Sequence, residues 1–83
     1  MNQARIHERY YLTYPRNLIR EPILYQLVKK FDLVFNIRGA SVSEEMGLVA
    51  VEFEGSAEQI DHAVNWLRQS GLTVEPIEKN VIE

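Results

Sequence analysis

Hydrophobic and polar residues alternate with a period of two in three stretches of the chain, which is typical of strands with one buried face. The first is Glu8–Tyr14, and Pro15 ends it because proline cannot continue a ladder of backbone hydrogen bonds. Two more lie back to back at Leu33–Val42 and Leu48–Phe53. A last, short edge strand is predicted after Gly71.

Two further stretches have apolar residues at the spacing of an amphipathic helix. Pro22 suits the first turn of one helix, where its missing N–H costs nothing. Ser56 and Gln59 have the spacing of a capping box at the start of the other, and Ser70-Gly71 is a typical helix end. The predicted buried stripes are Ile23, Leu24, Leu27, Val28 and Phe31 in the first helix, and Ala57, Ile60, Ala63, Val64 and Leu67 in the second.

The order β-α-β-β-α-β predicts an α+β, ferredoxin-like fold, a four-stranded antiparallel sheet with two helices on one face. We expect the domain to span residues 8–78, with short tails at 1–7 and 79–83, and the two middle strands to be joined through residues 41–47. The residues predicted to face the helices are Tyr10, Leu12, Tyr14, Leu33, Phe35, Ile37, Val49, Val51 and Phe53.

The other face of the predicted sheet is uncovered and rather apolar. An exposed apolar patch usually marks an interface, so we predict a homodimer seam through Leu48, Ala50 and Val34. A merely mixed surface is the alternative, because single exposed apolar residues are normal. By strand alternation this face displays Tyr11, Thr13, Val34, Asn36, Arg38, Leu48 and Ala50.

A chain of 83 residues forms one domain, and its small core leaves stability marginal. The sequence has no cysteine, so neither a disulfide nor a thiolate metal site adds support, and self-association is the common remaining remedy. No apolar run approaches the roughly 20 residues of a membrane span. The start, Met1–Arg5, lacks the apolar stretch of a signal peptide. We therefore predict a cytoplasmic protein with no membrane insertion.

The net charge of −3 is unevenly placed. Residues 1–40 carry seven basic and three acidic side chains, whereas residues 41–83 carry two basic and nine acidic ones. Solvated faces are the simpler explanation. The alternatives are charge complementarity between two copies, or a basic patch that meets an anion. The acidic total argues against nucleic-acid binding, as do Glu52 and Glu54 on the predicted open face.

Motifs of catalysis are missing from the sequence. It has no phosphate-binding loop, and its two histidines, His7 and His62, are far apart along the chain. Glu52 and Glu54 share one side of a strand, and a solvated face is a better interpretation of them than an acid–base pair. We predict no catalytic residue, no metal and no cofactor, hence a non-enzymatic protein.

Three segments carry a further signal: Phe35–Gly39 in the predicted second strand, Glu21–Val28 with its Pro-started first helix, and Gly47–Val49 at the start of the third strand. In order and spacing they resemble the corresponding segments of the NIL domain family, which is named for Asn-Ile-Leu in its second strand. Phe53–Ile60 is similar to its strand-Gly-helix junction, and Trp66-Leu67 to its late-helix pattern. The resemblance spans residues 10–77.

This resemblance implies a ferredoxin-like regulatory domain, related in shape to ACT domains. Such domains commonly stand at the C-terminus of the ATPase subunit of methionine ABC importers, where they pair as dimers and bind methionine. This chain looks like a free-standing version, of the kind found in cyanobacteria. It implies an amino-acid-sensing homodimer that acts on a partner protein. A protein–protein adaptor without a small ligand is the alternative.

The resemblance also implies a ligand site on the second strand. The motif asparagine corresponds to Asn36, whose amide both donates and accepts hydrogen bonds. Arg38 stands where the motif has leucine; it would either clamp a ligand carboxylate or occupy the space of the ligand. A polar dimer seam is an equal alternative for both residues. The predicted ligand contacts are Asn36, Arg38, Ile37, Tyr11 and Thr13.

Overall fold

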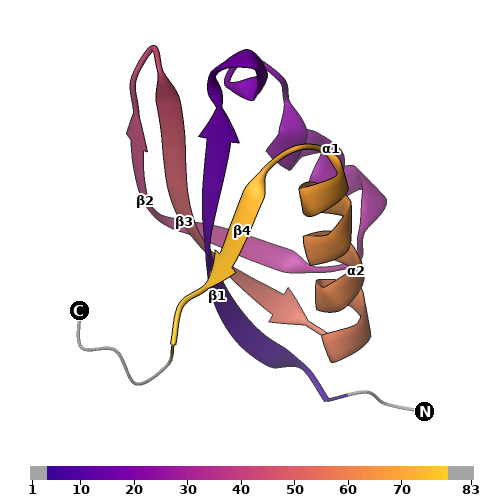
Figure 1. Cartoon of the computed structure of the whole chain (residues 1–83). Coiled ribbons are helices and arrows are strands. Elements are labelled where there is room, and N and C mark those ends of the chain that lie inside the picture. Colours follow the sequence, from indigo (N-terminus) through magenta and orange to yellow (C-terminus); the bar gives the residue numbers. More distant parts are fainter. Residues whose placement is uncertain (1–3, 79–83) are drawn as a thin grey trace.

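The computed structural model describes residues 4–78 and confirms the predicted order of elements (Figure 1). All strand pairs in the single sheet are antiparallel, and the strand order is β2-β3-β1-β4. The predicted tail at 79–83 lies outside the described residues. The elements are β1 (Ile6–Pro15), the 3₁₀ turn η1 (Arg16–Leu18), α1 (Ile23–Lys30), β2 (Val34–Val42), β3 (Met46–Gly55), α2 (Ala57–Gln69) and β4 (Thr73–Pro76).

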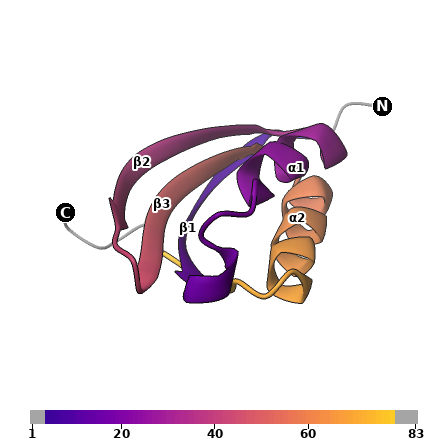
Figure 2. The ribbon, with the colours of Figure 1, turned by 90° about the horizontal axis from the view of Figure 1, so that it is seen from above.

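Both helices cover the same face of the sheet, as predicted for the ferredoxin-like α+β fold (Figure 2). The core lies between these two layers and draws its strand residues mainly from β1 and β3, the two central strands. Their predicted inward residues are buried; β1, however, begins at Ile6, inside the predicted tail. The buried core is Tyr10, Leu12, Tyr14, Ile23, Leu27, Leu33, Val49, Val51, Phe53, Ile60, Ala63, Val64, Leu67, Leu72 and Val74.

The edge strand β2 departs from the prediction. Ile37 lies opposite the buried Val51, so it faces the helix side, yet it is 56% exposed and not part of the core. Phe35 is only partly buried, edge-on to Phe53 at 6.5 Å. Alternation decides which way a side chain points, but burial needs a covering element. The helix α2 packs against β3 and β4, toward the edge of the sheet opposite β2, so Ile37 is left uncovered and its prediction as a core residue was wrong.

Two helical positions were also assigned wrongly to the buried stripes. Val28 is 45% exposed because α1 has only eight residues and turns Ile23 and Leu27, one helical turn apart, toward the sheet. Ala57 is exposed because it is the first residue of α2, ahead of the turn that reaches the core. Ile60 and the rest of the predicted α2 stripe are buried.

The capping box at the start of α2 is half made. The Ser56 hydroxyl accepts the backbone N–H of Gln59 at 3.2 Å, as predicted. The Gln59 side chain, however, accepts the backbone N–H of Asp32 at 3.2 Å. It therefore ties the start of α2 to the turn before β2.

The end of α2 is a Schellman motif. The N–H of Leu72 donates to the carbonyl of Leu67, and that of Gly71 to the carbonyl of Arg68. Gly71 has a φ of +109°, and a Cβ there would lie 2.9 Å from the side chain of Leu18. The predicted helix stop is therefore confirmed, and it sets the start of β4.

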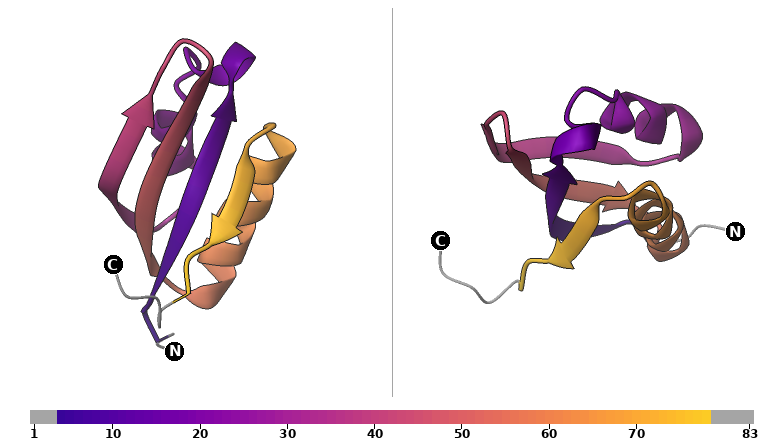
Figure 3. Two further views of the ribbon diagram at one scale, coloured as in Figure 1. Left: turned by 60° about the vertical axis from the view of Figure 1, so that its left-hand side comes forward. Right: turned by 45° about the horizontal axis from the view of Figure 1, so that its top comes forward.

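The connection between β2 and β3 is tighter than predicted. The strands continue to Val42 and resume at Met46. The hydroxyl of Ser43 accepts the backbone N–H groups of Glu45 and Met46, each at 3.2 Å. This local bonding fixes a short turn at the same end of the sheet as η1 (Figure 3).

Candidate functional site

The sheet face that the helices leave uncovered is called here the open face. Residues directly opposite on antiparallel strands point to the same side, so the register arranges the open face in rows across β1, β3 and β2. Along β3 the rows pass from charged to apolar. Each row is given with its residue on β1, then β3, then β2. The rows are His7, Glu54 and Val34; Arg9, Glu52 and Asn36; Tyr11, Ala50 and Gly39; and Thr13, Leu48 and Ser41.

Glu52 is the centre of the charged end of the open face. Its carboxylate lies 3.1 Å from Arg38 Nη1, 3.1 Å from His7 Nδ1 and 4.0 Å from Arg9 Nε. Its side chain is only 19% exposed. The interpretation of Glu52 as a merely solvated residue therefore misses its main role, which is to hold side chains from β1 and β2 over β3.

The neighbouring rows form the apolar end of the open face. Tyr11 is 43% exposed and Leu48 37% exposed, and Ala50 on β3 lies between Tyr11 on β1 and Gly39 on β2. A Cβ added at Gly39 would meet no atom within 4 Å. The small residues Ala50 and Gly39 therefore leave this part of the open face low. Tyr11 lies next to it on β1, and Arg38 lies next to it on β2.

Four of the five predicted ligand residues lie together on the open face. Tyr11 and Thr13 come from β1, and Asn36 from β2. Arg38 lies at the register shift between Ile37 and Gly39, and its guanidinium reaches the open face through Glu52. Ile37 lies on the opposite face, because it follows Asn36 by one residue in the strand. The predicted interface residues Val34, Leu48 and Ala50 share the open face.

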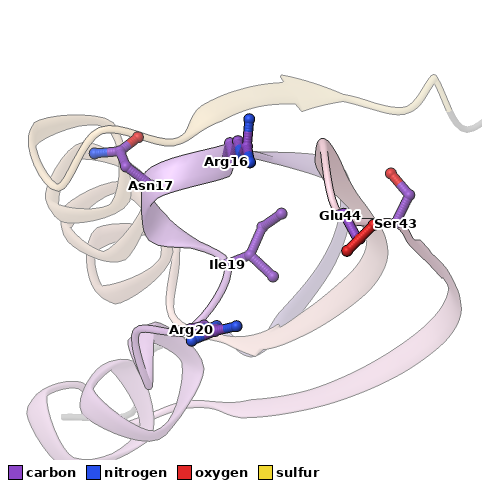
Figure 4. A pocket seen from close by; sticks show the side chains of 6 residues that line it. All are labelled: Arg16, Asn17, Ile19, Arg20, Ser43 and Glu44. Carbon is purple, nitrogen blue, oxygen red and sulfur yellow. The ribbon is translucent and has the colours of Figure 1, made fainter.

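A second feature, not singled out from the sequence, lies at the end of the sheet where η1 faces the β2–β3 turn. It is a hollow of about 770 Å³, called here the basic hollow, with Ile19 at its centre and side chains on opposite rims (Figure 4). Arg16 and Arg20 lie on the η1 side, and Ser43 and Glu44 lie across from them. Its lining is Arg16, Asn17, Ile19, Arg20, Ser43 and Glu44.

Ile19 also lines an adjoining apolar recess of about 260 Å³. Tyr14 is part of its wall, and burial raises the pKa of the Tyr14 phenol. Among the described residues, Glu21 is the only charged side chain that lines the recess. The lining is Tyr14, Ile19, Glu21, Pro22, Ile23, Leu24, Tyr25, Val42, Gly47 and Val49.

Neither the open face nor the hollow has the donors of a metal centre. Within residues 4–78, no group of three or more His, Asp or Glu side chains is placed to hold a metal ion. None of the helices in this part of the chain is long and apolar enough to cross a membrane.

Comparison with known proteins decides the family. The model of the NIL domain matches residues 8–76, which include Arg9, Arg38 and Glu52 of the charged end and the loop with Arg16 and Arg20. The chain belongs to the NIL domain family. This confirms the resemblance predicted from Phe35–Gly39 and the segments around it.

The curated relatives of this NIL domain are much longer proteins. The methionine import ATP-binding protein MetN of Helicobacter hepaticus is 24% identical over 76 residues, which is 87% of this chain and 22% of that protein. The protein of the same name from Ralstonia nicotianae is 32% identical over 63 residues, 71% of this chain and 18% of that protein. The chain thus spans about a fifth of these relatives.

A solved structure has the same fold as this NIL domain. It is the C-terminal domain of an ABC transporter ATP-binding protein from Enterococcus faecalis, with a TM-score of 0.75 at 17% identity, covering 88% of this chain and 86% of that one. At this identity the similarity establishes the ferredoxin-like arrangement of strands and helices and nothing finer.

Proposed function

We propose that this NIL domain is a non-enzymatic regulatory module of the cytoplasm that pairs as a homodimer and senses an amino acid, methionine first among the candidates. The observation that carries the proposal is the make-up of the open face. It sets the amide of Asn36 and the guanidinium of Arg38 beside the small residues Ala50 and Gly39. The printed names of the two curated relatives, methionine import ATP-binding proteins, support the choice of ligand.

The dimer seam in this proposal runs over the apolar end of the open face. Tyr11 and Leu48 at this end are 43% and 37% exposed, and Val34, in the row of Glu54 at the charged end, is 48% exposed; pairing would remove this apolar surface from water. The charged end supplies self-complementary groups, since Glu52 and Glu54 lie beside Arg9 and Arg38 on one surface. In a two-fold pair, acidic groups of one subunit can meet basic groups of the other.

A ligand between the two subunits would link sensing to regulation. An amino acid that contacts both copies stabilises one dimer arrangement, by no more than its difference in affinity for the two arrangements. Its α-carboxylate would have to compete with Glu52 for Arg38, while Asn36 bonds its polar groups. The dimer would then act on a transport ATPase or another partner protein.

A titration with L-methionine followed by ¹H–¹⁵N NMR tests this proposal. Saturable shifts around Asn36, Tyr11 and Arg38 are expected, and Asn36→Ala should abolish them while the rest of the spectrum stays folded. Thr13 is another predicted ligand contact, at the apolar end, and Thr13→Ala should bind more weakly without loss of the site. A flat response to methionine and to the other amino acids contradicts sensing.

The seam is tested separately by Leu48→Glu, which buries a charge in the proposed interface. Light scattering should show a dimer for the natural chain and a monomer for this variant. Glu45→Gln, in the β2–β3 turn, is the control and should leave the mass unchanged. An unchanged mass for Leu48→Glu would remove the open face as the seam.

One observation favours the second candidate, an adaptor that binds another protein without a small ligand. Arg38 is already paired with Glu52 at 3.1 Å, so its guanidinium is engaged within the domain. As an adaptor, the open face would bind a partner directly. A native-lysate pull-down that recovers one stoichiometric protein, together with a flat amino-acid titration, supports the adaptor.

A further inference from the structure

We propose that the free edge of β2, with the apolar groove between β2 and α1, binds an extended acidic segment of another protein as a fifth strand of the sheet. The groove is formed by the residues of β2 that point to the helix side and by the flank of α1 that faces them. This inference goes beyond the proposed sensing of an amino acid and does not depend on it, because the groove lies on the side of the sheet opposite the open face.

The strand β2 has one free side. It pairs with β3 alone, and within residues 4–78 no element pairs with its other side (Figure 1). Natural proteins usually protect such an edge with charges, proline or a covering element. The nine residues of β2 include one charged side chain, that of Arg38, and no proline, and the strand is irregular only at the register shift between Ile37 and Gly39. Its outer backbone N–H and C=O groups can therefore pair with an incoming strand.

The side of β2 that faces the helix layer is apolar and largely uncovered. Four residues lie opposite inward-facing residues of β3: Phe35, Ile37, Ala40 and Val42. Ile37 is 56% exposed and Val42 64% exposed, because α2 packs toward the other edge of the sheet. Every second side chain of an added strand would lie beside these residues, about 4.8 Å farther from β3. Strand addition would therefore bury apolar surface that the described chain leaves in water.

The flank of α1 that faces β2 is the other wall of the groove. Leu24 and Tyr25 line the apolar recess of about 260 Å³ together with Val42. Val28 lies one helical turn after Leu24, on the same flank, and is 45% exposed. An apolar side chain of the added strand next to Val42 would therefore be adjacent to this recess as well.

The size of the free edge favours a single strand over a second copy of the chain. Nine residues at about 3.3 Å each, in a strip about 10 Å wide, give roughly 300 Å², whereas a stable interface buries about 800 Å² on each partner. A second β2 paired about its middle would also place two Arg38 side chains and two register shifts against each other. A foreign strand has neither of these features.

The charge around the groove favours an acidic segment. The helix α1, the strand β2 and their connection carry three basic side chains and one acidic one: Lys29, Lys30, Arg38 and Asp32. Lys29 lies 5.3 Å from the centre of the Tyr25 ring, so one of the basic groups is at the groove wall. Acidic side chains on the open-face side of the added strand would lie beside Arg38, whose side chain is 44% exposed. Glu21, in the recess, would face the apolar side chains of that strand.

A synthetic strand tests this inference. The probe is the peptide acetyl-Val-Glu-Leu-Glu-Val-Glu-Leu-amide, titrated into the ¹⁵N-labelled whole chain and followed by ¹H–¹⁵N NMR. Saturable shifts are expected along β2 and the facing flank of α1. A peptide with lysine in place of each glutamate should bind about tenfold more weakly, because it meets basic groups. No saturable shift with the acidic peptide, or equal affinity for the two peptides, overturns the inference.

Backbone methylation tests whether the peptide binds as a strand. Alternate residues of a strand direct their N–H groups to opposite edges. One peptide has N-methyl groups on its three glutamates, and the other has them on the three apolar residues that follow the glutamates. One form should lose binding, and the other should keep it within about twofold. Loss in both forms, or in neither, overturns strand addition.

A pair of variants places the peptide on the helix side of β2. Ile37→Asn/Val42→Asn should weaken binding about tenfold or more, because two apolar contacts are lost. Both side chains are mostly exposed, so this variant should fold like the natural chain. Ser41→Asn is the control: it is next to Val42 but points to the open face, and should leave binding unchanged. Equal binding by both variants contradicts the groove.

Light scattering on the same proteins identifies a second copy as the occupant. A natural chain that is dimeric, that becomes monomeric in Ile37→Asn/Val42→Asn and that does not bind the peptide overturns the inference. Peptide binding together with a flat amino-acid titration supports the inference and removes the sensing function. Methionine binding without peptide binding has the reverse meaning.

Discussion

The two faces of β3 carry alternate residues of the same ten-residue strand and differ in almost every physical property. Val49, Val51 and Phe53 face the helices and are 7%, 0% and 0% exposed. Leu48, on the other face, is 37% exposed, and Glu52 lies among three basic side chains. One face is therefore stabilised by the removal of apolar surface from water, and the other carries charge pairs and exposed side chains.

The difference in exposure between the two faces distinguishes residues that stabilise the fold from residues that the fold does not require. A buried core residue is constrained by size and shape, so it follows from the fold alone. The open face and the basic hollow are not needed to fill the core. Their side chains, with Arg16, Arg20 and Asn36 exposed, are not constrained by packing in this way.

The largest expected difference between the two faces is the loss of stability when one apolar side chain on each face is truncated to alanine. Phe53→Ala should destabilise the domain by about 3–5 kcal/mol, through lost burial and the cavity left behind. Small domains have little stability to spare, so this variant should be largely unfolded. Leu48→Ala should cost less than about 1 kcal/mol in the isolated subunit, since its side chain is already partly in water.

Urea unfolding followed by circular dichroism, at protein concentrations low enough to avoid pairing, measures both variants. Equal losses for Phe53→Ala and Leu48→Ala would mean that the open face is covered in the folded subunit. That result would contradict the contrast between the two faces of β3.

A smaller effect is expected inside the open face. Glu52→Gln removes the negative charge shared by Arg38, His7 and Arg9, and should cost about 1 kcal/mol, because the basic partners are partly exposed and screened. Glu54→Gln is the matched control. Glu54 is more exposed and pairs with Arg5 at 3.4 Å, so its loss should be a few tenths of a kcal/mol.

A double-mutant cycle between Glu52→Gln and Arg38→Gln isolates the pair at 3.1 Å. A coupling near zero would show that Glu52 is held by burial against β1 and β2 and not by its charge. Arg38 would then be free to bind an outside carboxylate.

The smallest effect is a loss of stability at alkaline pH. It comes from the buried tyrosines on the face of the sheet that packs against the helices. Burial raises the pKa of Tyr14, and burial followed by the charges of Glu8 and Asp61 raises that of Tyr10. The folded state therefore holds these protons more tightly than the unfolded chain, whose tyrosines have a pKa of about 10. The tyrosine contribution to stability should be constant below about pH 10 and should be lost as the pH rises beyond it, because the unfolded state ionises first.

Urea unfolding at several alkaline pH values tests this effect. Tyr14→Phe should make the fall less steep, leaving the part that comes from Tyr10. Tyr25→Phe, at a position that is 63% exposed, should leave the slope as it is. The same slope in all three proteins would show that tyrosine burial has no part in alkaline unfolding.

Prediction from sequence succeeded where a local signal and burial agree. Period-two alternation placed Tyr10, Leu12 and Val51 in the core, and the Ser-x-x-Gln and Ser-Gly pairs located both ends of α2. Prediction failed at Ile37, Val28 and Ala57, which have the right spacing but no element above them. Periodicity reports the direction of a side chain, not what covers it.

The open face and the basic hollow also differ in how far the sequence could predict them. Strand alternation alone grouped Tyr11, Thr13 and Asn36 on one face and should have set Ile37 apart from them. The basic hollow had no comparable signal. Arg16 and Arg20 are separated from Glu44 by more than twenty residues, and only the folding of β1 and the β2–β3 turn to one end of the sheet places them around Ile19.

The sequence by itself determined the order of the elements, the two caps of α2, the family and the central core, because each follows from neighbours in the chain or from spacing along one element. Only the tertiary structure decided the pairing of Arg38 with Glu52, the exposure of β2, and the hollow between η1 and the β2–β3 turn. These depend on distances between segments remote in sequence, which are set by strand register, by the register shift after Ile37 and by the reach of the helices over the sheet.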